Sequence, residues 1–467
     1  PCSLQLAAYL FNRAEGHPLF TIELLNNLIE QNLLRQYNDG SWLPPEASVP
    51  VPTVLRQLIN RRVRRLGPDV EKLLSVAAVA GETWPLQIIE TQLDLAEESV
   101  LVALEGALAG DLIVTEDDRA ETYRFSHGLI KQVLYENQLA RRRKLVHQKI
   151  AGQYEKQPAA NVYLIAHHYY EAEAWVKAFQ YCSEAGEQAA KSFANNRALG
   201  LYQKAMEAAH HAANKIDPQK LLKAYENLGE TYQVLDRQEE AQRTFSRMRD
   251  AAHGLGDLAG EVRALVHLTM VRVTMYELDL AEKTAQEALI TGAQINDPRL
   301  KAQIHGALAK LLLVEGKMDE LDQHIQQVLQ YTAENDHETL SLAFRQQTYR
   351  AIFRGNYEEA EAYAQQSLAY AQNTGIPLYV AGGYQILSFV EIEAGKYDQA
   401  YKNMRSILDY QEMSDPYFHQ LPRLLNQMGY LYFELGDVGK ALSWDRRAVE
   451  ASRSSPGTAN FEMQRYS

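Results

Sequence analysis

Two pairs of adjacent histidines are the side chains that come closest to a metal-binding pattern. His167-His168 and His210-His211 fall in segments whose apolar spacing predicts helices, and no cysteine or carboxylate stands at ligand spacing from either pair. A zinc site needs three or four such ligands. The sequence therefore favours surface or packing roles for these histidines, and we predict no metal site in this chain.

The sequence contains no phosphate-binding loop of the form GxxxxGK[ST]. Three Gly-Lys pairs, at Gly316, Gly395 and Gly439, lack both the upstream glycine and the following Ser or Thr of such a loop. Paired carboxylates such as Glu239-Glu240 stand at expected helix starts, where acidic groups are favourable for the helix dipole. Because ATP hydrolysis requires the missing loop, we expect that this chain by itself is not an enzyme and holds no cofactor.

Whole-chain composition narrows the class of protein. A chain of 467 residues is too long for one compact core, and 46% hydrophobic with 23% charged residues is typical of folded soluble domains. The net charge of −13 argues against a nucleic-acid-binding surface over most of the length. Two cysteines, Cys2 and Cys182, offer no disulfide framework. No apolar stretch is long enough to cross a bilayer, so we expect a cytoplasmic protein with no membrane partner.

The C-terminal half repeats with a period of about 40 residues. A small or apolar residue marks the start of each expected second helix: Ala241, Ala281, Leu321, Ala360, Ala400 and Ala441. Five residues before each marker we place a turn residue: Asp236, Tyr276, Gly316, Gly355, Gly395 and Gly436. Such a fixed period predicts a solenoid, in which each helical unit buries its apolar face against its neighbours. Asp-Pro pairs at positions 217, 297 and 415 are expected to start first helices, with Asp as the cap.

The N-terminal third predicts several helices and two short hairpins. Helices are expected at about 4–14, 19–35, 53–66 and 69–80, with turn residues Asn38-Asp39-Gly40 between two short strands. Helices at 86–92 and 97–109 followed by strands at 112–116 and 121–125 give the outline of a winged helix. Helix 97–109 would enter a DNA groove, but it contains no Lys or Arg, so we predict a packing module without direct nucleic-acid contact.

Two sets of residues resemble known families. Leu228, Gly229, Tyr232, Ala241 and Phe245 have the spacing of the tetratricopeptide signature, and so do Met428, Gly429, Tyr432, Gly436 and Ala441. The segments AEGHPLFTIELLNNL, VPTVLRQLINRRVRRL, VEKLLSVAAVAGETW and YRFSHGLIKQVLYENQL, in that order, resemble the STAND ATPases. These are signal-transduction ATPases with numerous domains, among them bacterial regulators of the maltose-activator (LuxR-like) type and ATPases attached to kinases and cyclases. The resemblance covers the whole chain as lid helices, winged helix and sensor.

The STAND resemblance assigns nucleotide-contact roles to two motifs. Gly16-His17-Pro18 matches the family's GxP motif, and this implies that Pro18 packs against adenine in the closed state. His127 stands where the family's winged-helix histidine contacts the ADP β-phosphate, although Gly128 replaces the Asp of that motif. A simple helix break at Gly16 and a capping or packing histidine at 127 are the alternatives. ATP or ADP with Mg²⁺ is expected only together with a P-loop domain, which we expect N-terminal to Pro1.

The resemblance to tetratricopeptide proteins implies that first helices line a concave groove. Helical spacing places there a set rich in arginine and aromatic residues, which are enriched at binding hot spots: Lys310, Arg345, Tyr349, Gln385, Phe389, Arg423, Asn426 and Tyr430. The equivalents in the helix at 218–235 are acidic and polar: Lys223, Glu226, Glu230 and Gln233. We therefore predict a site for an inducer, protein or small molecule, in the C-terminal units, with ordinary solvated or inter-helix residues as the alternative.

Together these patterns predict a mainly α protein: a winged-helix domain followed by a tetratricopeptide-like solenoid. The expected domains are a lid region at 1–66, the winged helix and following helices at 67–155, linking helices at 156–216, repeats at 217–453 and a tail at 454–467. The expected function is the sensing part of a bacterial STAND ATPase that controls a nucleotide-dependent switch and oligomerises when activated. A stand-alone scaffold for protein interactions, without nucleotide coupling, is the alternative.

Overall fold

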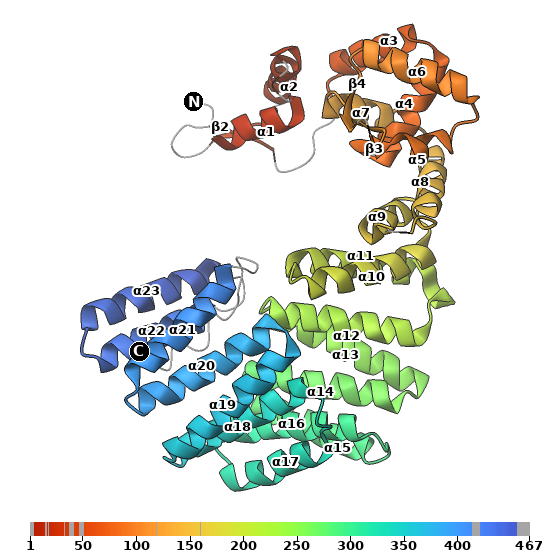
Figure 1. The fold of residues 1–467 in the computed structure, drawn as a ribbon. Helices are drawn as coiled ribbons and strands as arrows, with labels where there is room; N and C mark the ends of the chain where they lie inside the picture. Colours follow the sequence, from red (N-terminus) through yellow and green to blue (C-terminus); the bar gives the residue numbers. More distant parts are fainter. Residues whose placement is uncertain are drawn as a thin grey trace. The chain divides into compact units, whose positions relative to one another are not determined.

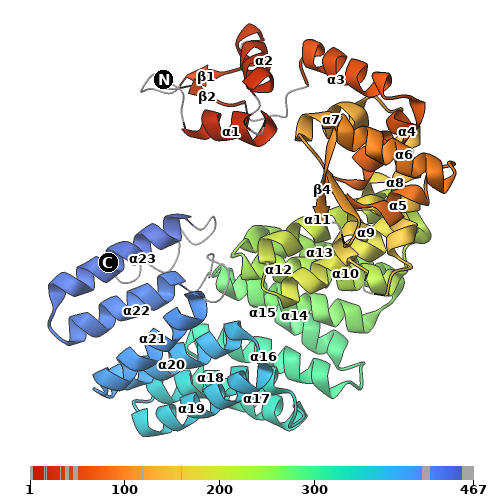
Figure 2. The same cartoon turned by 45° about the horizontal axis from the view of Figure 1, so that its top comes forward.

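The computed structural model describes residues 4–14, 16, 18–31, 33–36, 42–45, 51–117, 119–158, 160–412 and 421–454. The chain divides into two compact units, Pro1–Cys182 and Ser183–Ser467. The predicted turn Asn38-Asp39-Gly40, His17, the capping pair Asp415-Pro416 and the tail from residue 455 lie outside the described residues. Figures 1 and 2 show the helices and strands of each unit.

Unit 1 begins with the helices and short hairpin that the sequence predicts. Helix α1 (Leu4–Ala14) is followed by α2 (Pro18–Glu30), the paired strands β1 (Arg35–Gln36) and β2 (Trp42–Leu43), and α3 (Thr53–Arg65). The predicted end of the second helix at Arg35 is wrong, because α2 ends at Glu30 and Arg35 belongs to β1. Arg13 on α1 donates a hydrogen bond of 2.9 Å to Gln132 Oε1 on α7 (Gly128–Glu136), so α1 is bound to the later helices of this unit.

The next part of unit 1 has the element order predicted for a winged helix. It contains α4 (Pro68–Ala80), β3 (Thr83–Pro85), α5 (Leu86–Glu90), α6 (Glu97–Ala109), β4 (Ile113–Asp117) and β5 (Thr122–Phe125). The strands form one antiparallel sheet in the order β3-β5-β4. The sequence did not predict β3, which holds Trp84 in the core with no exposed surface. The nearly continuous apolar sequence of α4 is buried among α6 and α7.

Unit 1 continues with α7, α8 (Ala140–Tyr154), α9 (Val162–Glu171) and α10 (Trp175–Lys191), of which α10 carries the boundary between the units. Glu155, the C-cap of α8, accepts hydrogen bonds from Tyr169 on α9 and from Lys177 and Tyr181 on α10. These bonds hold the pKa of the Glu155 carboxyl at about 2. The network ties three consecutive helices together.

Unit 2 is a solenoid of helix pairs. After the end of α10, its first complete helix is α11 (Asn195–Ala212), followed by a short 3-10 turn at Ala213–Lys215. The first helices of the six following pairs are α12 (Pro218–Val234), α14 (Leu258–Thr274), α16 (Pro298–Glu315), α18 (His337–Phe353), α20 (Pro377–Glu393) and α22 (Leu421–Glu434). The second helices are α13 (Gln238–Leu255), α15 (Leu278–Gly292), α17 (Met318–Tyr331), α19 (Tyr357–Thr374), α21 (Tyr397–Glu412) and α23 (Val438–Ser454).

The six residues that mark the repeat all occupy the fourth position of a second helix and are buried. Ala241, Ala281, Leu321, Ala360 and Ala400 have no exposed surface, and Ala441 has 5%. A small side chain at this position allows the two helices of a unit to pack closely. The predicted helical repeat is therefore confirmed.

The predicted turn residues are confirmed by their backbone conformation. All six have a positive φ, from 55° at Asp236 to 76° at Gly316 and Gly436. A first helix ends there and the chain reverses, as in left-handed helix C-caps. Glycine takes this conformation without steric cost, which explains why four of the six units use it.

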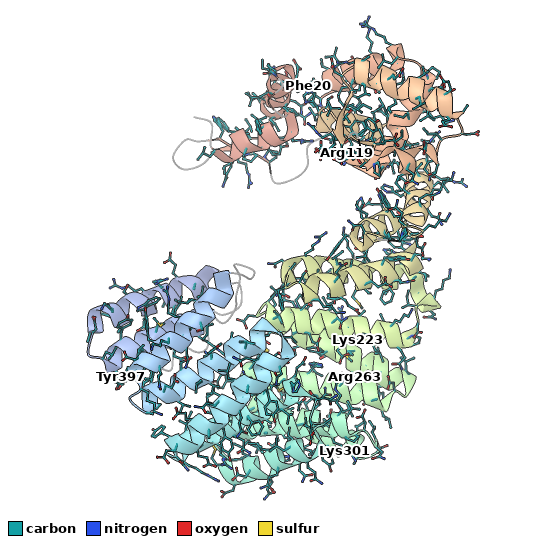
Figure 3. The ribbon with its side chains drawn as sticks, in the orientation of Figure 1. Phe20, Arg119, Lys223, Arg263, Lys301 and Tyr397 are labelled. Atoms are coloured by element: carbon teal, nitrogen blue, oxygen red, sulfur yellow. The ribbon has the colours of Figure 1, made fainter. Side chains whose placement is uncertain are left out.

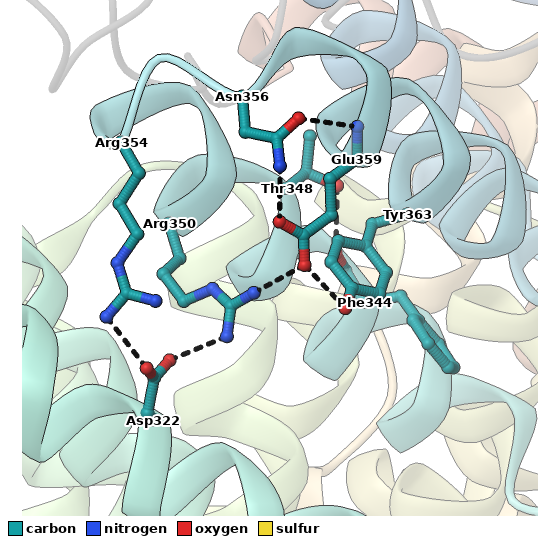
Figure 4. Close-up of polar contacts among 8 residues, drawn as sticks. All are labelled: Asp322, Phe344, Thr348, Arg350, Arg354, Asn356, Glu359 and Tyr363. Carbon is teal, nitrogen blue, oxygen red and sulfur yellow. Dashed lines mark hydrogen bonds and ion pairs between the residues drawn. The ribbon is translucent and has the colours of Figure 1, made fainter.

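Ion pairs add to the apolar packing between neighbouring units. Arg350 on α18 donates hydrogen bonds of 2.8 Å to Asp322 on α17 and to Glu359 on α19 (Figure 4). Arg354 also binds Asp322, at 2.8 Å. The Arg350 side chain is only 14% exposed, so this network joins three helices from two units in a partly dehydrated place. Among the described residues, no helix is both long and apolar enough to cross a bilayer.

Candidate functional site

The first helices of unit 2 define its inner surface. Along the solenoid, α14 packs against α16, α16 against α18 and α18 against α20, in addition to the contacts within each pair. When first helices approach each other while second helices diverge, the row of pairs curves with its first helices on the inner side. Side chains on α12, α14, α18 and α20 therefore face a common inner surface.

A cluster of ionisable groups occupies the α12–α14 part of this surface. Glu226 on α12 is 8% exposed and lies 3.2 Å from the Nζ atom of Lys223 and 3.4 Å from the Nε atom of Arg263. His267 on α14 places Nε2 3.6 Å from Glu226 and 3.7 Å from Glu230. Figure 3 shows Lys223 and Arg263 on these neighbouring helices. We call Glu226, Glu230 and His267 the acidic cluster.

The two carboxyl groups of the acidic cluster have different environments. Burial favours the neutral form of Glu226, but the hydrogen bond with His267 and the charges of Lys223 and Arg263 outweigh it and hold the pKa near 2. Desolvation raises the pKa of the Glu230 carboxyl, although 48% of this side chain remains exposed. The charges of His267 and Lys223 lower that pKa, whereas the charges of Glu226 and Glu338 raise it. Glu226 is thus a fixed anion, whereas Glu230 is subject to both attraction and repulsion.

Tight packing beneath the cluster fixes its position. The ring of His267 stacks on Phe245 of α13, with centroids 4.5 Å apart and planes only 2° apart. Phe245 in turn lies against Gly229, where an added Cβ would come within 2.4 Å of the ring. Gly229 and Phe245 are both positions of the tetratricopeptide signature, so the repeat packing itself holds the imidazole beside the two carboxylates.

Residues from later units act on the same cluster. Glu338 on α18 and Tyr379 on α20 both interact electrostatically with Glu230 on α12. The Tyr379 hydroxyl donates to Glu338 at 3.4 Å, and burial together with the Glu338 charge raises the Tyr379 pKa. The charge of Arg345 on α18 also reaches Tyr379. Side chains from α12, α18 and α20 thus act electrostatically on one another at the inner surface, which also carries Lys223 and Arg263 beside Glu226.

The predicted partner-binding residues are distributed along the inner helices rather than gathered at one point. Arg345 packs against Gly382, where an added Cβ would lie 2.9 Å from its Nη1 atom. Phe389 and Tyr430 have ring centroids 6.4 Å apart, and Tyr430 donates a hydrogen bond of 2.8 Å to Glu393. Tyr349 is 36% exposed. Of the predicted set, Arg345 is the residue whose charge acts on Tyr379, and Tyr379 in turn interacts with Glu230 of the acidic cluster.

The other members of that set contact neighbouring helices. Lys310 donates to Thr274 on α14, and the backbone oxygen of Gln385 accepts from Gln427 on α22. Asn426 lies 3.5 Å from Asp445 on α23, so it lies between the two helices of its own unit. Arg423 is exposed. From the sequence alone we predicted the binding site in the C-terminal units and not at the acidic residues of α12. The four-residue spacing of Glu226 and Glu230 could have identified them as neighbours on one helix face.

In unit 1 the two predicted nucleotide-contact motifs lie close together. Gly16 has φ 76° and precedes α2, which starts at the exposed Pro18. Phe20 in the first turn of α2 meets the ring of His127, the N-cap residue of α7, edge to face at 5.4 Å. His127 is extended and half-buried, and its side chain makes no cap hydrogen bond. His127 therefore lies beside α2, the helix that begins at Pro18 of the other motif.

Comparison with known proteins supports the fold. No protein-family model matches the sequence, and no curated protein does. A Rap protein crystallised with Competence and Sporulation Factor has 13% identity and TM-score 0.51, with 68% of this chain and 94% of that one covered. The Rap conjugation gene regulator of plasmid pLS20, crystallised with the Phr* peptide, has 14% identity and TM-score 0.51, with 82% and 95% covered.

A STAND protein with a tetratricopeptide repeat sensor from Pyrococcus horikoshii is also similar, at 16% identity and TM-score 0.40 over 96% of this chain. The match spans 63% of the length of that protein. With the helix pairs described above, the two Rap structures identify unit 2 as a tetratricopeptide-like solenoid.

Proposed function

We propose that this chain is the regulatory, signal-sensing part of a STAND-type ATPase, and that its signal is a peptide or a protein segment bound on the inner surface of unit 2. The observation that carries the proposal is the acidic cluster, with Glu338, Tyr379 and Arg345 acting on the same surface from later units. A peptide bound there contacts several units at once. Its binding can therefore change the curvature of the solenoid.

The chemistry of this surface favours a ligand that carries a positive group. Glu226 is ionised, and Glu230 is subject to repulsion from Glu226 and Glu338 as well as attraction from His267 and Lys223. A lysine or arginine side chain placed between these carboxylates would relieve the repulsion and lower the pKa of Glu230. Arg345, which lies against Gly382, would bind a carboxylate of the same peptide. A ligand with both charges, spaced along an extended backbone, fits best.

Proteins of the same fold provide a precedent. Both Rap structures with TM-scores of 0.51 are complexes, one with Competence and Sporulation Factor and one with the Phr* peptide. At 13–14% identity these proteins support only the fold of this chain. The proposal that the chain binds a peptide therefore rests on the chemistry of its own inner surface.

The nucleotide-dependent half of the proposal rests on unit 1. Pro18 is exposed at the start of α2, and the contact between Phe20 and His127 brings the two motifs together. In the proposed switch these residues contact ADP held by a P-loop domain, with Pro18 at the adenine and His127 at a phosphate. Signal binding in unit 2 would shift the closed ADP state towards an open, oligomerising state. Helix α6, which has no Lys or Arg, gives no support to direct DNA contact.

Selection of ligands from a random linear peptide library tests the sensing role. The purified chain is expected to enrich peptides with a basic residue, and fluorescence anisotropy then gives their affinities. Glu230→Gln and Arg345→Ala should each weaken binding at least tenfold, about 1.4 kcal/mol. Glu239→Gln, at a 70% exposed position on α13, is the matched control and should change nothing. Absence of enriched peptides, or equal affinities for all variants, would refute the sensing role.

The nucleotide coupling has a separate test in the complex of this chain with the P-loop domain. His127→Ala should raise the Kd for ADP severalfold, whereas His253→Ala, at a 77% exposed position on α13, should leave it unchanged. If peptide binding persists while ADP affinity is insensitive to His127, the chain is a peptide-binding scaffold without nucleotide coupling. That outcome would favour the alternative function.

A further inference from the structure

Three histidines from two helices of unit 1 come together at one place. His147 on α8 and His168 on α9 have 1% and 0% exposed surface, and their Nδ1 atoms are 2.8 Å apart. His167, the neighbour of His168, is exposed. One ring nitrogen from each of the three lies within 4.8 Å of the other two. We call these residues the histidine cluster.

The separations in the histidine cluster suit one metal ion. Imidazole nitrogens bind Zn²⁺ at about 2.0–2.1 Å, so two nitrogens on one tetrahedral ion are about 3.3 Å apart. The observed Nδ1–Nδ1 separation of 2.8 Å needs to open by only about half an ångström to admit the ion between the rings. The ring of His167 is 5.9 Å from that of His147 and 5.2 Å from that of His168, on the exposed side. His167 thus places a third imidazole on the side where solvent can supply a fourth ligand.

The surroundings prepare the buried histidines to act as ligands. The Tyr135 hydroxyl lies 3.1 Å from the Nε2 atom of His147, and a hydrogen bond there leaves Nδ1 directed at His168. Such a second partner orients metal-binding histidines generally.

We propose that His147, His167 and His168 bind one divalent transition-metal ion of the zinc class. Three imidazoles with an open position favour Zn²⁺, Ni²⁺ or Cu²⁺ over Mg²⁺ or Ca²⁺, which prefer oxygen ligands. The positive charges of Arg143 and Lys131 act on His147, so they would repel a bound dication. An anionic fourth ligand such as hydroxide or chloride is favoured for that reason. The ion would link α8 to α9.

The chain contains two matched controls. His305 on α16 and His324 on α17 also have Nδ1 atoms 2.8 Å apart, but within the described residues no third ligand atom groups with them. His210 and His211 are adjacent on α11, as His167 and His168 are on α9, and both are exposed. His305 and His324 match the Nδ1–Nδ1 separation of His147 and His168. His210 and His211 match the adjacency of His167 and His168 in the sequence.

Titration of the metal-free chain with Zn²⁺ by isothermal calorimetry tests the proposal. One equivalent should bind with micromolar or lower Kd, and His167→Ala should weaken that binding at least tenfold. His324→Ala and the double change of His210 and His211 to Ala should leave the first equivalent unchanged. X-ray absorption of the unmodified Zn²⁺-loaded protein should show three imidazoles, a readout that requires no variant to fold.

Two results would overturn the metal site. One is the absence of stoichiometric Zn²⁺ binding by the unmodified chain. The other is binding that survives His167→Ala unchanged or is lost with His324→Ala, which would place the ion elsewhere.

Discussion

Replacement of Glu226 by Gln tests the electrostatic description of the acidic cluster. The change keeps the shape of the side chain but removes the negative charge near Lys223, Arg263 and His267. A folded-state pKa of about 2, against an ordinary 4.5, corresponds to about 3 kcal/mol of stability at neutral pH. Removal of the Glu226 charge also removes its repulsion of Glu230, and this offsets part of the lost stability. We therefore expect Glu226→Gln to reduce the free energy of unfolding by about 2 kcal/mol at pH 7.

The pH dependence has a definite sign. Because the folded-state pKa of Glu226 is lowered, its contribution is complete above pH 4.5 and is lost as the pH falls towards 2. Urea unfolding followed by circular dichroism should show the difference between unmodified protein and Glu226→Gln shrinking over that range. Glu239→Gln, from an exposed ion pair, should cost no more than about 0.5 kcal/mol at either pH. A difference that is absent at pH 7, or that stays constant down to pH 2, would refute the reasoning.

Three further changes test the packing of the solenoid. Gly316→Ala should destabilise the protein by about 1–2 kcal/mol because φ is 76° at this position. Gly306→Ala, in open space within α16, should stabilise the protein by up to about 1 kcal/mol. Thermal melts in which both variants shift the midpoint in the same direction would contradict these expectations. Gly229→Ala should cost about 1–3 kcal/mol in urea unfolding because the new methyl group meets Phe245, and an unchanged midpoint would show that the ring moves aside freely. Arg350→Met should cost about 2 kcal/mol by the same assay because it removes two charged hydrogen bonds; Arg243→Met, 72% exposed, should cost less than about 0.5 kcal/mol, and equal losses would contradict the role of the network.

The sequence contained most of the information about the fold. The markers at Ala241 and its equivalents predicted the helix pairs because a repeated unit must place the same small residue at the same contact. The turn residues predicted the chain reversals because a left-handed C-cap favours glycine. Strand β3 could not be predicted because Trp84 and its neighbours form only three residues of extended chain, and pairing with β5 stabilises them.

The candidate site was less accessible to sequence reasoning. The predicted set contained Arg345, which lies on the first helix α18 as helical spacing indicated, and its role in binding stays a prediction. The electrostatic effect of Glu338 and Tyr379 on Glu230 depends on rotation accumulated over several units, which no local pattern contains. The histidine cluster was missed for a related reason: His147 and His168 are 21 residues apart and meet only when α8 packs against α9.

Photo-crosslinking tests the central claim, that unit 2 binds a peptide on its inner surface, most directly. A peptide selected by the unmodified chain, with a photoreactive group beside its basic residue, is irradiated in the complex, and mass spectrometry locates the bonds. The account predicts bonds to α12, α14, α18 or α20, and their loss in Glu230→Gln. Bonds confined to the second helices α13, α15, α17 or α19 would contradict it.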